Sequence, residues 1–429
     1  MRLHACGFLN NCIFVCVQNK QNNLNLALFI AKRISINSER TFSKLIVRIA
    51  VVGIMLGIAV MLLSIAIIKG FKSEIREKIR GFNGDIELLK YDLNASAENS
   101  PFVLNTNTLN TVKHNANVLS LAPFANKPGI IKTQNEVEGV VFKGIDASYN
   151  LKYLQSILIS GSLINFKVAL SADKQILISN ILATRLNLKV GDDFLMYFMQ
   201  ESLRKRKFKI VGIYNTDVEE IDKTYVIGNI NVVKKINKWQ ANQVGGFEIT
   251  INKFDDLDNI ALEIANLLPP EIKIMSIKEL YPAIFEWLAL LDVNTKVILV
   301  LMLIVATINM ISALLIMILE RTNMIGLLKA FGQTNWGVRK IFMYNAVYLI
   351  SLGMILGNII GLGLGFLQHQ THLLKLDAAT YYMRFVPIEI TFVDVLLINA
   401  GTLVVCFLVL LVPSMLVSRI SPIKAIAFK

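Results

Sequence analysis

The sequence predicts a membrane protein with four transmembrane α-helices, in which a large α+β domain separates the first helix from the other three. Four apolar stretches carry this prediction, namely residues 49–68, 297–319, 344–366 and 395–417. Each holds about 20 residues or more with almost no charge, enough for a helix to cross a hydrocarbon core of about 30 Å. Between the first two stretches lies a polar insert, residues 69–292, in which short β-type runs alternate with helical ones.

Charge predicts the orientation of these helices. The formal net charge is +13, and nearly all of it lies in residues 1–48, 320–340 and 418–429, whereas the insert is close to neutral. Short segments rich in Lys and Arg remain on the cytoplasmic side of a membrane. We therefore expect both termini and residues 320–340 to be cytoplasmic, and the insert and residues 367–394 to lie outside. Because the positive charge is a topology signal, we expect no nucleic-acid partner.

The segments beside the first span have patterns of their own. Residues 1–23 lack an apolar run followed by a small-residue cleavage site, which predicts a disordered extension, or a start codon placed too early, rather than a signal peptide. Residues 24–48 begin apolar and turn basic, as is typical of a cytoplasmic interfacial helix. Glu74 and Lys78, four residues apart, predict that the first span continues as a helical stalk. A second helix, residues 277–291, is expected to lead to the second span.

The insert predicts an α+β domain. No cysteine lies in it, so the domain must be stabilised by its core rather than by disulfide bonds. Changes in composition near Gly144 and Gly245 predict two lobes, the inner one (residues 146–244) inserted into the outer. Strands are expected at residues 85–89, 137–143, 176–179, 194–199, 208–213, 247–251 and 272–276, and helices at residues 179–186 and 255–267.

Two neighbouring runs in the insert each have two interpretations. Residues 194–199 read FLMYFM, which is apolar on both faces. This pattern favours a central strand buried on both sides over a surface for lipid or acyl chains. The basic run Arg204, Lys205, Arg206 and Lys207 is typical of a solvated hairpin tip, and it is the candidate hairpin for a periplasmic partner.

The spans carry a glycine pattern. Glycines recur every four residues in the third span, and a shorter version occurs in the first. Spacing of four places them along one helix face, where the missing side chains let another backbone come close. The sequence does not indicate what they pack against. The candidate helix-packing glycines are Gly53, Gly57, Gly353, Gly357, Gly361 and Gly365.

The sequence shows no constellation for catalysis or metal binding. The four histidines are scattered, and His369 and His372 lack a third ligand nearby. There is neither a G-x-x-x-x-G-K-[ST] phosphate loop nor a G-x-S-x-G elbow. We therefore expect a non-catalytic chain that binds no metal or cofactor itself.

The loop after the second span resembles a known family. Residues 320–334 read ERTNMIGLLKAFGQT, similar to the E-R-x-x-E-I-G-x-L-[KR]-A-x-G-[AG]-[ST] stretch of the FtsX/MacB/LolC-LolE permeases of the type VII ABC transporter superfamily. The resemblance covers most of the chain, including FIAKR (29–33), VFKGID (141–146) and ILISNILATRLNLKVGD (176–192). The stalk, residues 70–82, and the size of the insert are most similar to the lipoprotein-releasing LolC/LolE branch.

This resemblance implies a fold and a set of partners. The insert would be a MacB-like periplasmic core domain, and the chain would be a permease subunit in the bacterial inner (cytoplasmic) membrane. Residues 320–340 would form a cytoplasmic coupling loop that docks on a separate ABC ATPase similar to LolD, which would hold ATP and Mg²⁺. The residues that match the coupling helix are Glu320, Arg321, Gly326, Leu327, Leu328, Lys329, Ala330 and Gly332.

The resemblance also implies a task. It is the extraction of lipoproteins from the inner membrane for outer-membrane sorting, by a homodimer or by a pair with a sibling permease protomer. The acylated substrate would lie between the first two spans of facing protomers, among membrane lipids. MacB-like efflux and FtsX-like mechanotransmission to a cell-wall hydrolase are alternatives. An alternative of another class is a membrane-anchored sensor that binds a ligand without transport.

The sequence departs from the family at two places. The Glu that follows E-R-x-x in the family is Met324 here, so any ion pair that this Glu makes with the ATPase is missing or replaced. LolC-type permeases carry a long, proline-bearing hook that captures a periplasmic carrier. The matching hairpin here, residues 200–207, is short and has no proline. Docking of a periplasmic carrier is therefore left open.

Overall fold

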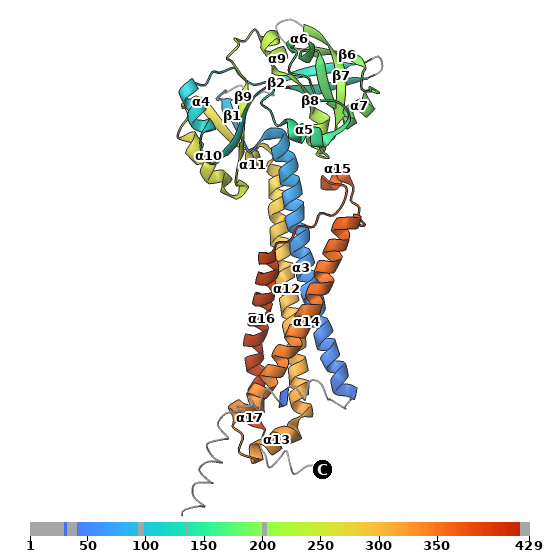
Figure 1. Cartoon of the computed structure of the whole chain (residues 1–429), viewed down its shortest axis with the longest axis vertical. Coiled ribbons are helices and arrows are strands. Elements are labelled where there is room, and N and C mark those ends of the chain that lie inside the picture. The colour runs from blue at the N-terminus through green and yellow to red at the C-terminus, as the bar shows by residue number, and fades with distance from the viewer. Residues whose placement is uncertain (1–29, 32–40, 93–97, 134–135, 200–203, 421–429) are drawn as a thin grey trace, which may run out of the picture. The chain divides into compact units, whose positions relative to one another are not determined.

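The computed structural model of the 429-residue chain describes residues 30–31, 41–92, 98–133, 136–199 and 204–420 (Figure 1). The predicted N-terminal extension, most of the predicted interfacial helix and the end of the C-terminal tail lie outside these residues. The chain divides into two compact units. We name them the membrane unit, within residues 1–70, 291–372 and 387–429, and the sheet unit, residues 71–290 and 373–386.

The described residues include four helices that are long and apolar enough to cross a membrane. They contain the predicted apolar stretches almost entirely, which confirms the one-plus-three order of spans. The first of them is an unbroken helix of 43 residues, which confirms the predicted stalk, and its Glu74 and Lys78 pair at 3.7 Å. The four helices are α3 (Thr41–Asn83), α12 (Pro282–Glu320), α14 (Asn335–Thr371) and α16 (Phe392–Ser414).

The predicted helix at residues 277–291 consists of two pieces. The first is α11 (Ile277–Leu280), which begins with a capping box between Ser276 and Glu279. The helix is interrupted at Tyr281, and α12 begins at Pro282. Proline suits the first position of a helix because its missing N–H would have no intrahelical partner there.

Apolar side chains from several helices form the core of the membrane unit. Ile54 and Ile58 of α3 are fully buried and belong to one apolar cluster with Phe342 of α14 and Leu410 of α16. Ile325 of the short helix α13 (Thr322–Ala330) belongs to the same core. After α16 the last described helix is α17 (Leu416–Arg419). The loop helix and the spans therefore share one packed interior.

The sheet unit is built on one ten-stranded mixed sheet with the strand order β10-β1-β9-β2-β3-β8-β5-β7-β4, in which β6 pairs with both β2 and β7. The β3–β8 and β5–β7 pairs are parallel, and the other pairs are antiparallel. The strands are β1 (Ile86–Lys90), β2 (Val118–Lys132), β3 (Val137–Ile145), β4 (Leu158–Gly161), β5 (Gln175–Ser179), β6 (Asp193–Phe198), β7 (Arg204–Tyr214), β8 (Tyr225–Asn229), β9 (Gly246–Ile251) and β10 (Ile272–Ser276).

Short helices accompany the sheet. All but the last of them connect consecutive strands, and several begin with a side chain that caps a free backbone N–H, as Asn105, Asn150 and Ser179 do. The helices are α4 (Thr106–Lys113), α5 (Leu151–Ile157), α6 (Ala169–Ala172), α7 (Asn180–Arg185), α8 (Glu219–Thr224), α9 (Ile230–Asn237), the 3₁₀ helix η1 (Phe254–Asp256), α10 (Leu257–Ala265) and α15 (Ala378–Tyr381).

Six strands close into a ring, β2-β3-β8-β5-β7-β6, which returns to β2. Phe142, Phe198 and Phe208 are fully buried and pack ring against ring at centroid distances of 5.5–6.4 Å. Closure removes the unpaired edges that an open sheet would expose. The predicted inner lobe, residues 146–244, supplies β5–β8, but the ring also needs β2 and β3 from outside that range.

The seven predicted strands are present as β1, β3, β5, β6, β7, β9 and β10, whereas β2, β4 and β8 were not predicted. The prediction that residues 194–199 are buried on both faces is wrong. Phe194, Met196 and Phe198 of β6 are buried, but Leu195 is 39% exposed and Met199, just after the strand, is 68% exposed. β6 pairs with a strand on each side, yet its side chains on the outer face of the ring are exposed to solvent.

Candidate functional site

The loop between α12 and α14 folds into one short helix. α12 ends at Glu320, α13 follows directly, and Gly332, with φ +86°, allows the turn toward α14. Thr334 caps α14 by accepting a hydrogen bond of 3.1 Å from the Gly337 N–H. Of the two glycines in this loop, Gly326 lies inside α13, whereas Gly332 follows the end of the helix.

α13 has a buried side and an exposed side. Ile325 and Gly326 are buried, and Leu328 packs against the core. On the other side Leu327 is 51% exposed, and Phe331, which ends the helix four residues later, is 79% exposed. Residues four apart lie on one face of a helix. We name Leu327 and Phe331 the apolar α13 face. Apolar side chains this exposed beside a packed core mark a surface that another protein can cover.

Lys329 of the predicted coupling helix binds groups of its own chain. The Lys329 ammonium donates hydrogen bonds of 2.7 Å to the carbonyl oxygens of Val417 and Ile420, at the end of α17. A lysine in this place satisfies carbonyls that lack an intrahelical partner. Burial, and then the neighbouring Arg339, lower the pKa of Lys329. Arg339 in turn donates to the Ser418 hydroxyl at 3.0 Å. α13 is thus fastened to the end of the last span.

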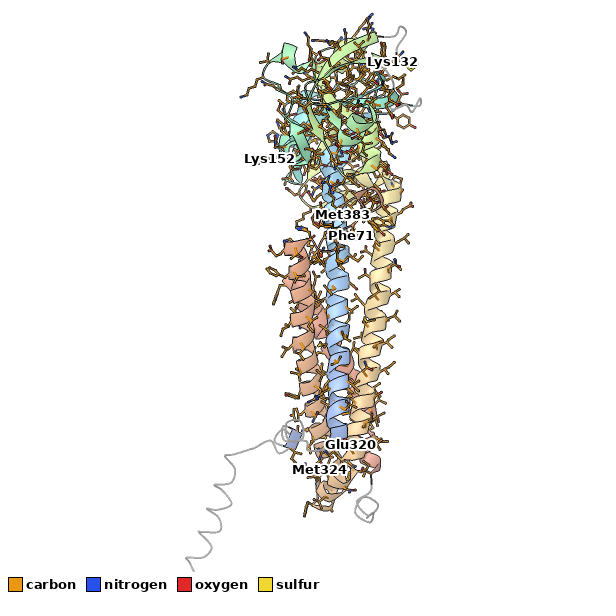
Figure 2. All side chains as sticks on the ribbon, turned by 90° about the vertical axis from the view of Figure 1, so that its right-hand side faces the viewer. Phe71, Lys132, Lys152, Glu320, Met324 and Met383 are labelled. Atoms are coloured by element: carbon orange, nitrogen blue, oxygen red, sulfur yellow. The ribbon has the colours of Figure 1, made fainter. Side chains whose placement is uncertain are left out.

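Glu320, Arg321 and Met324 are half-buried, and Figure 2 shows Glu320 and Met324 at the end of the membrane unit where α13 lies. Met324 packs against the apolar core. At this position, where the family has Glu, the side chain therefore contributes to the interior of its own unit. Ala330 and Gly332 are exposed beside the apolar α13 face.

The glycines of the third span lie against the first span. A Cβ added to Gly353 would stand 2.8 Å from the Ile54 Cβ, and one added to Gly357 would stand 2.7 Å from the Ile58 Cβ. One added to Gly361 would stand 3.1 Å from the Ala59 Cα. Real Cβ atoms essentially never come closer than 3.0 Å, and a contact of 3.1 Å is tighter than most, so the two helices approach this closely because these side chains are absent.

The other candidate glycines have different neighbours. Gly53 and Gly57 of α3 face α12, where an added Cβ would collide with the Asn309 side chain or stand 3.7 Å from the Ala306 Cβ. Gly365 is less constrained, because an added Cβ would make an ordinary contact of 3.4 Å with Ile388. The fourth glycine of the row therefore lines an opening rather than a tight helix contact.

Polar side chains join the spans to α16. Asn358 of α14 and Asn399 of α16 exchange two hydrogen bonds of 2.8 and 3.0 Å. Lys69 of α3 forms an ion pair of 2.6 Å with Asp394, which Thr391 also binds in a capping box. Polar groups paired across helices stabilise a membrane bundle because the hydrocarbon offers no other partner. Neither pair was predicted from the sequence.

The end of the stalk is held by buried charge in the sheet unit. Lys143 of β3 is 1% exposed, forms an ion pair of 2.6 Å with Glu248 and donates to the Phe82 carbonyl oxygen at 2.5 Å. Tyr149 donates to the same carbonyl oxygen. Burial raises the pKa of Glu248 to about 7, against the lowering effect of Lys143. Glu87, also buried, has a raised pKa for the same reason. We name Lys143, Glu87 and Glu248 the stalk cluster.

The outer loop after α14 is anchored to the stalk within the sheet unit. Asp217 binds two cations, Lys78 at 3.0 Å and Arg384 at 3.2 Å. Lys78 also donates to the Tyr382 carbonyl oxygen at 3.0 Å, and the Tyr382 ring lies 6.3 Å from that of Trp287. We name Lys78, Asp217 and Arg384 the outer-loop anchor. The lone Asp217 gave no signal in the sequence, because its partners are 139 and 167 residues away.

The predicted partner hairpin is a strand over its basic part. Arg204 opens β7 and donates to the Ile236 carbonyl oxygen at 3.1 Å, whereas Lys205, Arg206 and Lys207 are exposed. The tip, residues 200–203, lies outside the described residues. Beside the run is an open hollow of about 750 Å³ with both charged and apolar side chains. It is lined by Lys132, Thr133, Glu136, Arg185, Leu186, Asn187, Leu188, Asp193, Phe194, Leu195, Tyr197 and Lys207, of which Figure 2 labels Lys132.

Metal ligands are not grouped in the part of the chain that the structure describes. No cluster there holds three or more His, Cys, Asp or Glu side chains in a metal-binding arrangement. His369 and His372 lie at the end of α14, and His372 adopts a left-handed conformation that ends the helix. The features that stand out are therefore contact surfaces and helix junctions.

Two family models match the chain in succession. The model described as MacB-like periplasmic core domain matches residues 49–267, just over half of the chain. The model described as FtsX-like permease C-terminal matches residues 296–422. Together they cover the first span, the sheet unit up to α10, the loop that contains α13 and the last three spans.

Relatives match over nearly the whole length. The lipoprotein-releasing system transmembrane protein LolC of Neisseria meningitidis is 22% identical, over 90% of this chain and 95% of that protein. LolE of Haemophilus influenzae, named as a transmembrane protein of the same system, is 19% identical, over 94% of this chain and all of that protein. The periplasmic region of MacB from Actinobacillus actinomycetemcomitans aligns at 15% identity over 49% of this chain and 97% of that structure, with a TM-score of 0.33, too low to carry an argument. By the two family models, this chain belongs to the FtsX/MacB/LolC-LolE family of ABC transporter permeases.

Proposed function

We propose that this chain couples ATP hydrolysis by a separate ATPase to movement of its sheet unit, and that it extracts lipoproteins from the inner membrane. The observation that carries the coupling is the apolar α13 face. Leu327 and Phe331 are exposed on a helix whose opposite side lies in the core. An amphipathic helix of this kind fits a groove on a partner protein.

Contacts within the membrane unit would transmit a displacement of α13 to the transmembrane helices. Lys329 fastens α13 to the end of the last span, and Ile325 places it in the common core. α3 and α12 then run without a break from the membrane unit into the sheet unit, over 43 and 39 residues. Helices of this length act as rods of about 60 Å at a rise of about 1.5 Å per residue.

The far ends of these rods have firm attachments. The stalk cluster binds the last carbonyl groups of α3 to β3, and the outer-loop anchor binds the stalk to the loop between the third and fourth spans. Movement of the stalk would therefore carry the sheet and the outer loop with it. The bacterial inner membrane, cytoplasmic termini and a periplasmic sheet unit fit the charge distribution of the loops.

Lipoprotein is the substrate that the relatives favour, since LolC and LolE are named as parts of lipoprotein-releasing systems. We place ATP and Mg²⁺ on the partner ATPase, and a second permease protomer beside this one. The exposed side chains Lys205, Arg206 and Lys207, beside the open hollow on the ring, form the surface for a periplasmic partner such as a carrier.

The test begins with the protein in its native membrane. We would purify the chain in mild detergent and identify what accompanies it by mass spectrometry. A stoichiometric P-loop ATPase together with triacylated lipoproteins is the expected result. ATP-dependent release of a lipoprotein from proteoliposomes that hold both subunits would complete it. An efflux partner or a cell-wall hydrolase in place of lipoproteins would overturn the task, and the absence of any ATPase would overturn the coupling.

A further inference from the structure

A hollow of about 360 Å³ lies inside the membrane unit, between the first span, the third span and the segment that leads to the fourth. Its walls are apolar except for one histidine. Its lining comes from the middle of α3, from the last turns of α14 and from the segment before α16. The lining residues are Leu62, Ala66, Gly361, Leu362, Gly365, Phe366, His369, Ile388 and Ile390.

The hollow exists because side chains are missing from α14. Gly365 leaves the surface of α14 bare, because an added Cβ would make only an ordinary contact of 3.4 Å with Ile388, whereas Gly361 still packs tightly against α3. The third wall, Ile388 and Ile390, is fixed in place by backbone contacts. The Glu389 N–H donates to the Ala66 carbonyl oxygen at 3.0 Å, although Ala66 lies within α3. Side chains therefore do not fill the space at this point, and the hollow stays open.

Charged groups flank one end of the hollow. Lys69 lies one helical turn beyond Ala66 and pairs with Asp394, and Glu389 between the two wall isoleucines is exposed. His369 lies one turn beyond Gly365. Both signs of charge therefore occur at one end of the hollow, while its other walls are apolar. A molecule that binds here should therefore be charged at one end and apolar along the rest of its length.

We propose that this hollow holds one acyl chain of a zwitterionic glycerophospholipid, whose phosphate and ammonium lie beside Lys69, His369 and Glu389. Water would find few polar partners here, and a dry apolar cavity of about 150 Å³ already binds a small hydrocarbon. The bilayer supplies acyl chains at very high local concentration. A bound chain would fill the gap between α3, α14 and the approach to α16, and so stabilise the junction. This inference rests on the proposed function only for the choice of the outer leaflet.

Two glycines of α14 offer a matched test. Gly365 lines the hollow, whereas Gly363, two residues away on the same helix, is exposed with nothing within 4 Å of an added Cβ. We would reconstitute the full chain in phosphatidylethanolamine nanodiscs that contain a trace of phosphatidylethanolamine with a photoreactive diazirine in one acyl chain. After illumination, mass spectrometry maps the labelled residues.

We expect labelling to concentrate on Leu62, Phe366 and Ile388. Gly365→Leu should lower it on the order of tenfold, since its side chain takes the space of several methylene groups, and Gly363→Leu should leave it unchanged. Gly365→Ala, whose Cβ makes only an ordinary contact, should lower the labelling partly. Because this variant should fold normally, it separates a filled hollow from a folding defect. Uniform labelling of all lipid-facing residues, or equal labelling of Gly365→Leu and the parent, would overturn the proposal. Loss of labelling upon adding a triacylated lipopeptide would overturn the phospholipid as occupant in favour of an acylated substrate.

Discussion

Between residues 51 and 62, α3 is held by a neighbour that approaches through glycine, whereas between residues 80 and 87 its end is held by buried charge. The first contact uses no polar group, as the near contacts of Gly353 and Gly357 show. The second uses Lys143 with two carboxylates that are almost inaccessible to water. In hydrocarbon, close van der Waals contact is the main attraction between helices. In a water-surrounded domain, a buried ion pair is weak evidence for stability but fixes which groups must meet. The two contacts should therefore fail under different conditions.

The largest effect is expected from Lys143→Met. It leaves Glu248 and Glu87 buried without their cation, and breaking a buried pair costs about 3–5 kcal/mol. Thermal unfolding of the purified full chain would measure the loss. The double variant Lys143→Met with Glu248→Gln should regain much of it, because no charge is then left unpaired at that position. Equal stability of the single variant and the parent would show that the stalk cluster does not hold the stalk.

The glycine contact should be nearly as sensitive. Gly357→Leu puts a side chain where even a Cβ would stand 2.7 Å from the Ile58 Cβ, and overpacking of this kind costs about 3 kcal/mol. The same unfolding assay measures it, with Gly363→Leu as the control because that position is open. If both variants lose the same stability, leucine at any position of α14 is harmful and the glycine face has no special role.

The pH dependence of the free energy of unfolding should distinguish the stalk cluster from the glycine contact. Burial raises the pKa of Glu248 from its ordinary 4.5 to about 7, so the folded chain holds a proton that the unfolded chain releases. The contribution of this proton is complete below about pH 4.5 and is lost as the pH rises to about 7, with a slope of at most about 1.4 kcal/mol per pH unit. Glu248→Gln should flatten the pH dependence of unfolding in this window, while Gly357→Leu should leave its slope unchanged. A slope that Glu248→Gln does not alter would contradict this assignment.

The outer-loop anchor should give the smallest effect. Asp217→Asn removes the partner of Lys78 and of Arg384, but Arg384 is well exposed, so solvent screens its share. We expect a loss of about 1 kcal/mol, seen as faster proteolysis or hydrogen exchange in residues 373–386. Lys223→Ala, which breaks an exposed pair with Glu219, is the control. Unchanged protection of the outer loop in Asp217→Asn would show that the ring contact of Tyr382 suffices.

The sequence predicted those parts of the molecule that depend on local pattern. Unbroken apolar stretches predicted the spans, and alternation predicted seven strands. β2 escaped prediction because it contains Pro123 and Pro128, which argue against a central strand. The stalk cluster and the outer-loop anchor escaped because their members meet only after folding, and nothing local indicates that Lys143 is buried. The row of glycines predicted a close contact, but only the structure identifies α3 as the partner.

The most direct test of the account compares two exposed phenylalanines at opposite ends of the membrane unit's helices. Phe331 is 79% exposed beside α13, and Phe392 is 80% exposed at the start of α16. We would purify the parent, Phe331→Ser and Phe392→Ser from native membranes and quantify the accompanying P-loop ATPase. The account predicts stoichiometric ATPase with the parent and with Phe392→Ser, and a large loss with Phe331→Ser at equal thermal stability. An ATPase that stays bound to Phe331→Ser, or none with the parent, would contradict it.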